Sequence, residues 1–163
     1  MDSNDGDLRA SLETAIYREI GARDFYGFIA KTITNPEGIK RFTQLSKDEE
    51  GHRTTLESRY EKLFGTPFEP ESEKLLESEI KGFKVEERTS AIEALDIAIE
   101  AESRAAEFYG QQAGATSHDE VKQMFLDLAE MEMGHYNLLV AERNQLVGGF
   151  YWFDMDSSGF MED

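Results

Sequence analysis

The sequence contains no cysteine, and this absence excludes several kinds of chemistry. Without thiols there is no disulfide framework, no iron–sulfur cluster, no thiolate zinc site and no cysteine nucleophile. Basic residues are also scarce, because 17 Lys and Arg stand against 34 Asp and Glu, for a net charge of −17. Such a chain cannot spare the basic patches that bind phosphates, so we expect no nucleic-acid partner.

Long apolar runs are missing as well. No stretch reaches the roughly 18 uninterrupted apolar residues of a membrane span, so we expect no membrane association. The first residues, MDSNDGD, are acidic and polar, unlike the basic and then apolar start of a signal peptide. We therefore expect a cytoplasmic protein, and its 163 residues are typical of one domain.

Proline is rare, and its three occurrences all fall between apolar-periodic runs, at Pro36, Pro67 and Pro70. These runs have helical spacing, and none shows sustained strand alternation. We predict long helices over residues 8–34, 36–65, 90–114 and 117–147, with a connector at 66–89 that holds a short helical piece near 71–80.

Local signals predict where these helices begin and end. Asn35 before Pro36 predicts the start of the second helix, since Asn caps well and Pro suits the first helical position. Ser90-x-x-Glu93 and Ser117-x-x-Glu120 are capping boxes for the third and fourth helices. Gly65 and Gly114 are expected to end the second and third.

Four long helices, two short links and one long connector predict an all-α four-helix bundle with a crossover, formed by residues 1–147. Residues 148–163 form a tail with the aromatic run Phe150-Tyr151-Trp152-Phe153, which we expect to pack on the bundle or on a dimer partner. Asp154-x-Asp156 resembles the start of a calcium loop, but no glutamate follows at the twelfth position, so we expect no calcium site.

An internal repeat relates the two halves of the chain. Residues 8–65 align without a gap with residues 91–148 at an offset of 83, and 18 of 58 positions are identical. The identities include Phe25 with Phe108, Tyr26 with Tyr109, and Phe42 with Phe125. The fold is therefore expected to consist of two duplicated helical hairpins joined by the connector.

Six ionisable residues occupy positions of the apolar stripes where leucine would be expected. They are Glu19, Glu49, His52, Glu102, Glu132 and His135. Isolated buried charges cost several kcal/mol or more each, so a positive partner is required inside the bundle. Two divalent cations would balance four carboxylates, with two neutral imidazoles completing the site. The oxygen-rich donor set suits iron or manganese, and zinc is a frequent substitute.

These residues carry a family resemblance. The segments AIYREIGARDFYGF and AIEAESRAAEFYGQ, followed by DEEGH and EMEMGH, resemble the ferritin-like superfamily and, within it, the rubrerythrin group, over about residues 8–147. The resemblance implies two iron ions bridged by Glu49 and Glu132. It further implies that Glu19 and Glu102 are terminal carboxylates, and that His52 and His135 are terminal imidazoles. Rubrerythrins proper also carry a four-cysteine rubredoxin domain and an extra glutamate near the third-helix ligand, and both are missing here.

The resemblance implies a non-haem di-iron oxidoreductase, associated with oxidative stress, that reduces hydrogen peroxide or dioxygen. Because cysteine is absent, its electrons would come from a separate donor protein, and we expect a homodimer. Two alternatives stay open. One is a ferroxidase of an iron-storage protein of bacterioferritin type, whose ligand set is equally symmetric; the other is a metal-stabilised bundle without catalysis.

The sequence also predicts where several polar residues outside the six lie. Tyr26 and Tyr109 lie two turns after Glu19 and Glu102, and we expect their hydroxyls to bond a ligand carboxylate and assist catalysis. His118 lies in the first turn of its helix and is expected at the surface. Asp48 falls off the apolar stripe and is expected to face solvent, as are four glutamates: Glu50, Glu100, Glu107 and Glu130.

Overall fold

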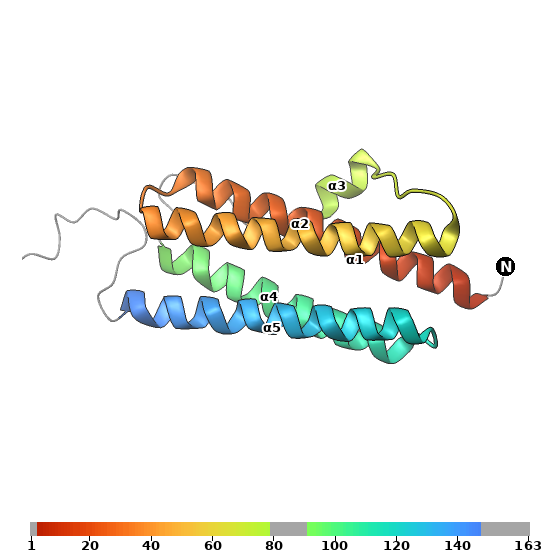
Figure 1. Cartoon of the computed structure of the whole chain (residues 1–163). Helices are drawn as coiled ribbons and strands as arrows, with labels where there is room; N and C mark the ends of the chain where they lie inside the picture. The colour runs from red at the N-terminus through yellow and green to blue at the C-terminus, as the bar shows by residue number, and fades with distance from the viewer. Residues whose placement is uncertain (1–2, 79–90, 148–163) are drawn as a thin grey trace, which may run out of the picture.

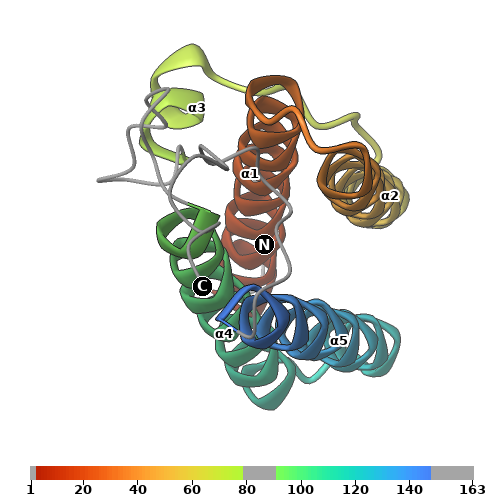
Figure 2. The same ribbon diagram turned by 90° about the vertical axis from the view of Figure 1, so that its left-hand side faces the viewer.

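The computed structural model describes residues 3–78 and 91–147. These residues form five α-helices and no strand: α1 (Ser3–Thr32), α2 (Pro36–Phe64), α3 (Ser72–Ser78), α4 (Ala91–Ala115) and α5 (Asp119–Val147). Figure 1 shows α1 and α2 as one hairpin lying above the hairpin of α4 and α5, and Figure 2 shows the four long helices end-on. The predicted all-α bundle of two helical hairpins is confirmed.

The link between α1 and α2 follows the predicted capping chemistry. The Asn35 side chain accepts hydrogen bonds from the backbone N–H groups of Glu37 and Gly38, at 3.0 and 3.2 Å. Pro36 is the first helical residue. At the other end of α2, Gly65 has a left-handed φ of 72° and its N–H donates to the Glu61 carbonyl at 2.8 Å. A residue with a side chain would be strained at this φ, which explains the glycine.

Several predicted helix boundaries differ from the structure by one to five residues. The first helix already begins at Ser3 rather than residue 8, and α4 continues through Gly114 to Ala115. The last helix begins at Asp119, so His118 rather than Ser117 precedes it. The His118 Nδ1 atom accepts the backbone N–H of Val121 at 3.4 Å, which makes this histidine the cap of α5. His118 aligns with Asn35 in the repeat, so the repeat itself indicates the true boundary.

The core consists of two apolar layers, one toward each end of the bundle. One layer contains Phe25, Tyr26, Ile29, Phe42, Leu45, Leu95 and Leu139. The other contains Leu12, Ile16, Leu56, Tyr109, Val121, Phe125 and Leu128. Repeat partners occupy opposite layers: Tyr26 lies in the first and Tyr109 in the second, as do Phe42 and Phe125. Burying each large side chain stabilises the fold by about 1.5–3 kcal/mol, so these layers drive folding.

The described part of the connector packs against the first hairpin. Phe68 meets the ring of Tyr17 edge-on at 5.3 Å between centroids, and the Glu71 N–H donates to the Tyr17 hydroxyl at 2.9 Å. The short helix α3 follows and lies beside α1 (Figure 1). Ser90, the remainder of the connector and the aromatic tail lie outside the described residues. In the residues that are described, no helix is both long and apolar enough to cross a membrane.

Candidate metal centre

Four glutamates lie buried between the two apolar layers, one from each long helix. Glu19 of α1, Glu49 of α2, Glu102 of α4 and Glu132 of α5 are all at most 3% exposed. Each glutamate occupies a position on the apolar stripe of its helix. Because this stripe packs against the other helices, the carboxylates point into the bundle. The structure therefore brings together all four glutamates that the sequence singles out.

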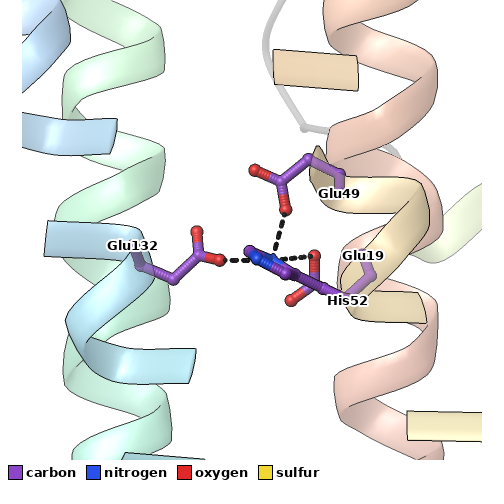
Figure 3. Close-up of side chains that lie close together, drawn as sticks. All are labelled: Glu19, Glu49, His52 and Glu132. Carbon is purple, nitrogen blue, oxygen red and sulfur yellow. Dashed lines mark ion pairs between the residues drawn. The ribbon is translucent and has the colours of Figure 1, made fainter. Parts of the chain in front are cut away.

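The two predicted histidines complete two overlapping clusters. One consists of Glu19, Glu49, His52 and Glu132, and the other of Glu49, Glu102, Glu132 and His135. In each cluster the potential ligand atoms all lie within 4.8 Å of one another. Glu49 and Glu132 belong to both. Figure 3 shows the first cluster, in which Glu132 approaches from α5 toward the three residues of the α1–α2 hairpin.

Both imidazoles turn Nδ1 toward the carboxylates. The Nδ1 atom of His52 lies 2.8 Å from Glu132 Oε1, 3.2 Å from Glu49 Oε2 and 3.5 Å from Glu19 Oε2. The Nδ1 atom of His135 lies 3.1 Å from Glu49 Oε1 and 3.5 Å from Glu102 Oε1. The two rings face each other, with centroids 5.8 Å apart and planes 21° from parallel.

The oxygen and nitrogen atoms of these clusters that could bind a metal are buried, and several of them lack hydrogen-bond partners. They are Glu19 Oε2, both carboxylate oxygens of Glu49, His52 Nδ1, Glu102 Oε2, Glu132 Oε1 and His135 Nδ1. The short approaches between them are therefore not hydrogen bonds. Each of the six residues contributes at least one such atom, and unsatisfied buried polar atoms are costly. Carboxylate oxygens and imidazole nitrogens are ligands for a divalent metal, so the residues present fit a metal centre.

Two buried tyrosines hold the remaining oxygens of the outer carboxylates. Tyr26 of α1 donates its hydroxyl to Glu102 Oε1 of α4, and Tyr109 of α4 donates to Glu19 Oε1 of α1. Each tyrosine thus bonds the glutamate of the other hairpin rather than the one on its own helix. Burial and the nearby carboxylates raise the pKa of both hydroxyls well above the usual value, so both stay protonated.

Four carboxylates this close cannot all be ionised in the absence of metal. Burial, together with Glu49, raises the pKa of Glu19 to about 8, and burial together with Glu102 raises that of Glu132 well above its usual value. Glu49 is buried too, but its close contacts with Glu19 and both histidines lower its pKa below the usual range. In the metal-free protein Glu49 is therefore the most acidic of these three carboxyl groups, and Glu19 and Glu132 take up protons more readily.

The histidines are charged in the same state. Burial alone would lower their pKa values, but the surrounding carboxylates outweigh it. The pKa of His52 rises to about 12 and that of His135 to about 11. These protons occupy the place that a cation would take, since they neutralise the carboxylates from within the same cluster.

One contact of the centre was missed by the sequence analysis. His135 Nε2 lies 3.1 Å from Asp48 Oδ2, so Asp48 does not simply face solvent. Asp48 falls off the apolar stripe of its own helix, and only the approach of α5 brings His135 to it. Its position directly before the glutamate of the Glu49-x-x-His52 motif was the available signal.

The centre opens on two sides. Between α2 and α5 lies a groove of about 1200 Å³, lined by both histidines, Asp48 and Met131. Ion pairs bridge these helices toward their ends, Arg41 with Glu142 at 3.1 Å and Arg59 with Glu120 at 2.5 Å. On the opposite side, between α1 and α4, a cavity of about 30 Å³ adjoins all four glutamates and both tyrosines, and is lined further by Ala22, Ala101, Ala105 and Arg18.

Comparison with known proteins places this arrangement in a family. The model of the family described as Rubrerythrin matches residues 11–142, which include all six residues of the two clusters. The chain belongs to the rubrerythrin family. This agrees with the resemblance carried by the two repeated motifs. No curated protein matches the sequence significantly.

Solved structures share the fold of this rubrerythrin-family chain. A hypothetical protein from Pyrococcus furiosus is 28% identical with a TM-score of 0.69, and the match covers 92% of this chain and 97% of that one. A dodecameric thioferritin from Bacteroides fragilis, described as bacterioferritin-related, is 17% identical with a TM-score of 0.66, covering 89% and 90%. A ferritin-like diiron-carboxylate protein from Bacillus anthracis is 19% identical with a TM-score of 0.65, covering 90% and 99%.

Proposed function

We propose that this chain is a non-haem di-iron oxidoreductase that reduces hydrogen peroxide or dioxygen. Glu19 and His52 would serve one iron, Glu102 and His135 the other, and Glu49 and Glu132 would bridge them. The observation that carries this proposal is the set of buried, unpartnered donor atoms, which forms two clusters that share the two central glutamates.

Bound there, two ferrous ions would supply, on oxidation to the ferric state, the two electrons that convert one hydrogen peroxide and two protons into two waters. The residues around them bind, orient and exclude water. Tyr26 and Tyr109 fix the outer carboxylates by hydrogen bonds, which leaves the second oxygen of each turned toward the centre. Since these 163 residues contain no cysteine for a rubredoxin-type iron, a separate donor protein would return the electrons.

The small cavity supports a small reactant. Its volume of about 30 Å³ matches the space of about one water molecule. Alanine side chains wall it beside the glutamates, so on this side of the centre there is room only for a small reactant. This agrees with peroxide or dioxygen as the reactant.

The test is anaerobic addition of hydrogen peroxide to the iron(II)-loaded protein. We expect oxidation of two irons per peroxide, followed by the rise of ferric absorbance, at a rate well above that of free iron(II). Oxidation no faster than that of free iron(II) would overturn the proposal. Glu132→Ala should abolish metal binding, while Glu130→Ala, an exposed neighbour on the same helix, should leave it unchanged.

The second candidate is ferroxidase activity in an iron-storage assembly. It is favoured by the symmetry of the donor set, since the residues beside Glu102 in the small cavity are Ala101 and Ala105 rather than a further carboxylate. Oxidation by dioxygen in preference to peroxide, together with retention of many irons per chain, would select it. Solution mass gives a second criterion, because a homodimer has only twice the 18.5 kDa of one chain.

A further inference from the structure

The two histidines of the centre are held differently, although they occupy matching positions of the repeat. His135 Nε2 lies 3.1 Å from the Asp48 carboxylate. The residue that matches Asp48 in the second half of the chain is Met131, whose thioether is only a weak acceptor. Among the described residues, the polar contacts of His52 all involve Nδ1.

This difference bears directly on metal binding. A histidine that offers Nδ1 to a metal carries its proton on Nε2, and an acceptor at Nε2 fixes both this tautomer and the orientation of the ring. Asp48 is such an acceptor for His135. Loss of an outer partner of this kind typically weakens metal binding by about 10- to 100-fold.

Both histidines line the groove between α2 and α5, together with Asp48 and Met131. Met131 is 51% exposed as a residue, and the Asp48 side chain is 37% exposed. The two matching positions thus present a carboxylate beside the His135 ring at one position and a flexible thioether at the other, in the same solvent-accessible groove. The four glutamates, the two histidines and the two tyrosines of the centre, by contrast, are identical in the two halves.

We propose that the two metal positions are unequal: the position served by Glu102 and His135 binds its ion more tightly than the position served by Glu19 and His52. Asp48 is a positioning residue, because it acts on the metal only through His135. This inference rests on the metal centre of the proposed function, but it does not require that the centre reacts with peroxide or dioxygen.

The test is anaerobic calorimetric titration of the metal-free protein with cobalt(II), with the number of bound ions measured in parallel. We expect two binding steps whose dissociation constants differ by about 10- to 100-fold. Asp48→Ala should weaken the tight step by that factor and bring the two steps together. Asp48→Asn keeps an oxygen that accepts the hydrogen bond from Nε2–H, so its tight step should be weakened less than in Asp48→Ala. Met131→Asp should strengthen the weak step.

Asp127→Ala is the matched control. Asp127 lines the same groove and has the same charge as Asp48, but its carboxylate accepts a hydrogen bond from Gln123 and contacts neither histidine. Both binding steps should be unchanged in this variant. A general electrostatic effect of groove acids would instead weaken binding in both Asp48→Ala and Asp127→Ala.

A second measurement separates positioning from a merely structural role. In the cobalt-loaded protein, proton NMR should show one slowly exchanging imidazole N–H, shifted by the metal, which is His135 Nε2–H protected by Asp48. This signal should disappear in Asp48→Ala and persist in Asp127→Ala.

The possible results are distinct for the two proposals. A single step with two equal affinities, or equal weakening of both steps by Asp48→Ala, would overturn the inequality. If two ions bind with equal affinity and peroxide still oxidises the iron, only the proposal of unequal metal positions is overturned. If no metal binds at all, both proposals fall.

Discussion

The two hairpins of this chain have the same residues at the positions that form the centre, and different residues at several positions around it. Each supplies a glutamate from its first helix, a glutamate and a histidine from its second, and a tyrosine that bonds the other hairpin's glutamate. Outside this set, Asp48 stands opposite Met131 in the repeat, Asn35 opposite His118, and Arg18 opposite Ala101.

This contrast teaches which positions the centre constrains. The proposed centre would need the same ligands twice, because each ion would require its own carboxylate and imidazole while sharing Glu49 and Glu132. Residues that act only through a donor, or that cap a helix, can diverge between the halves. The duplicated chain therefore provides its own matched controls, since the same change can be made at both positions of a pair.

The largest effect is expected in the apolar layers. Phe42→Ala and Phe125→Ala each remove a fully buried ring from opposite layers and should lower the free energy of unfolding by about 3–5 kcal/mol. Denaturant unfolding of the metal-free variants measures it. Because the layers are built alike, we expect losses within about 1 kcal/mol of each other; a much larger loss at one position would show that one hairpin dominates folding.

The second prediction concerns the pH dependence of the metal-free protein. The raised pKa values of Glu19, about 8, and of Glu132 mean that the folded state binds these protons more tightly than the unfolded state. The stabilisation from Glu19 is complete below pH 4.5 and is lost as the pH rises through 8, and the raised pKa of Glu132 acts in the same direction. The raised pKa values of His52 and His135 act in the same direction above about pH 6.5. Stability should therefore fall from pH 5 to 9.

Urea unfolding after chelation, repeated across this pH range, tests it. Glu19→Gln imitates the protonated side chain and should flatten the dependence, while Glu130→Gln at the surface should not. Metal binding must displace the same protons, so added metal should stabilise the protein more at pH 8 than at pH 6. A stability that is flat or rising between pH 5 and 9 would contradict the assigned protonation states.

Removal of either tyrosine hydroxyl should have a smaller, paired effect. In Tyr26→Phe the Oε1 atom of Glu102 loses its donor, and in Tyr109→Phe the Oε1 atom of Glu19 does. A buried oxygen left unsatisfied costs about 1–3 kcal/mol, and the freed carboxylate should bind metal less firmly. Metal titration and thermal unfolding measure the two effects. Unchanged metal affinity in both variants would mean that these hydroxyls contribute to the packing of the core and not to metal binding.

The smallest expected effect concerns the two helix caps. Asn35 accepts two backbone N–H groups at the start of α2, whereas His118 accepts one, at 3.4 Å, at the start of α5. Asn35→Ala should therefore cost about 1 kcal/mol and His118→Ala less. Chemical denaturation of the two variants compares them directly. An equal or larger loss at His118 would mean that its ring stabilises more than the helix end.

Much of this molecule follows from local chemistry in the sequence. The helical spacing of the apolar residues, the Asn35-Pro36 start and the Gly65 end predicted the elements, because periodicity and capping depend on near neighbours. The repeat predicted a pair of hairpins. The six candidate ligands stood out because an ionisable residue in an apolar stripe needs a partner, and the structure brings all six together.

What the sequence alone could not determine are the contacts that cross between the hairpins. Neither the Tyr26–Glu102 bond nor the Asp48–His135 contact follows from spacing, since their members lie 76 and 87 residues apart. Periodicity assigns a residue to a face of its own helix, whereas the antiparallel approach of α2 and α5 decides which faces meet. Local sequence thus determined which groups point inward. Only the docking of the two hairpins decided that the Nε2 atom of His135 meets a carboxylate, whereas that of His52 meets none among the described residues.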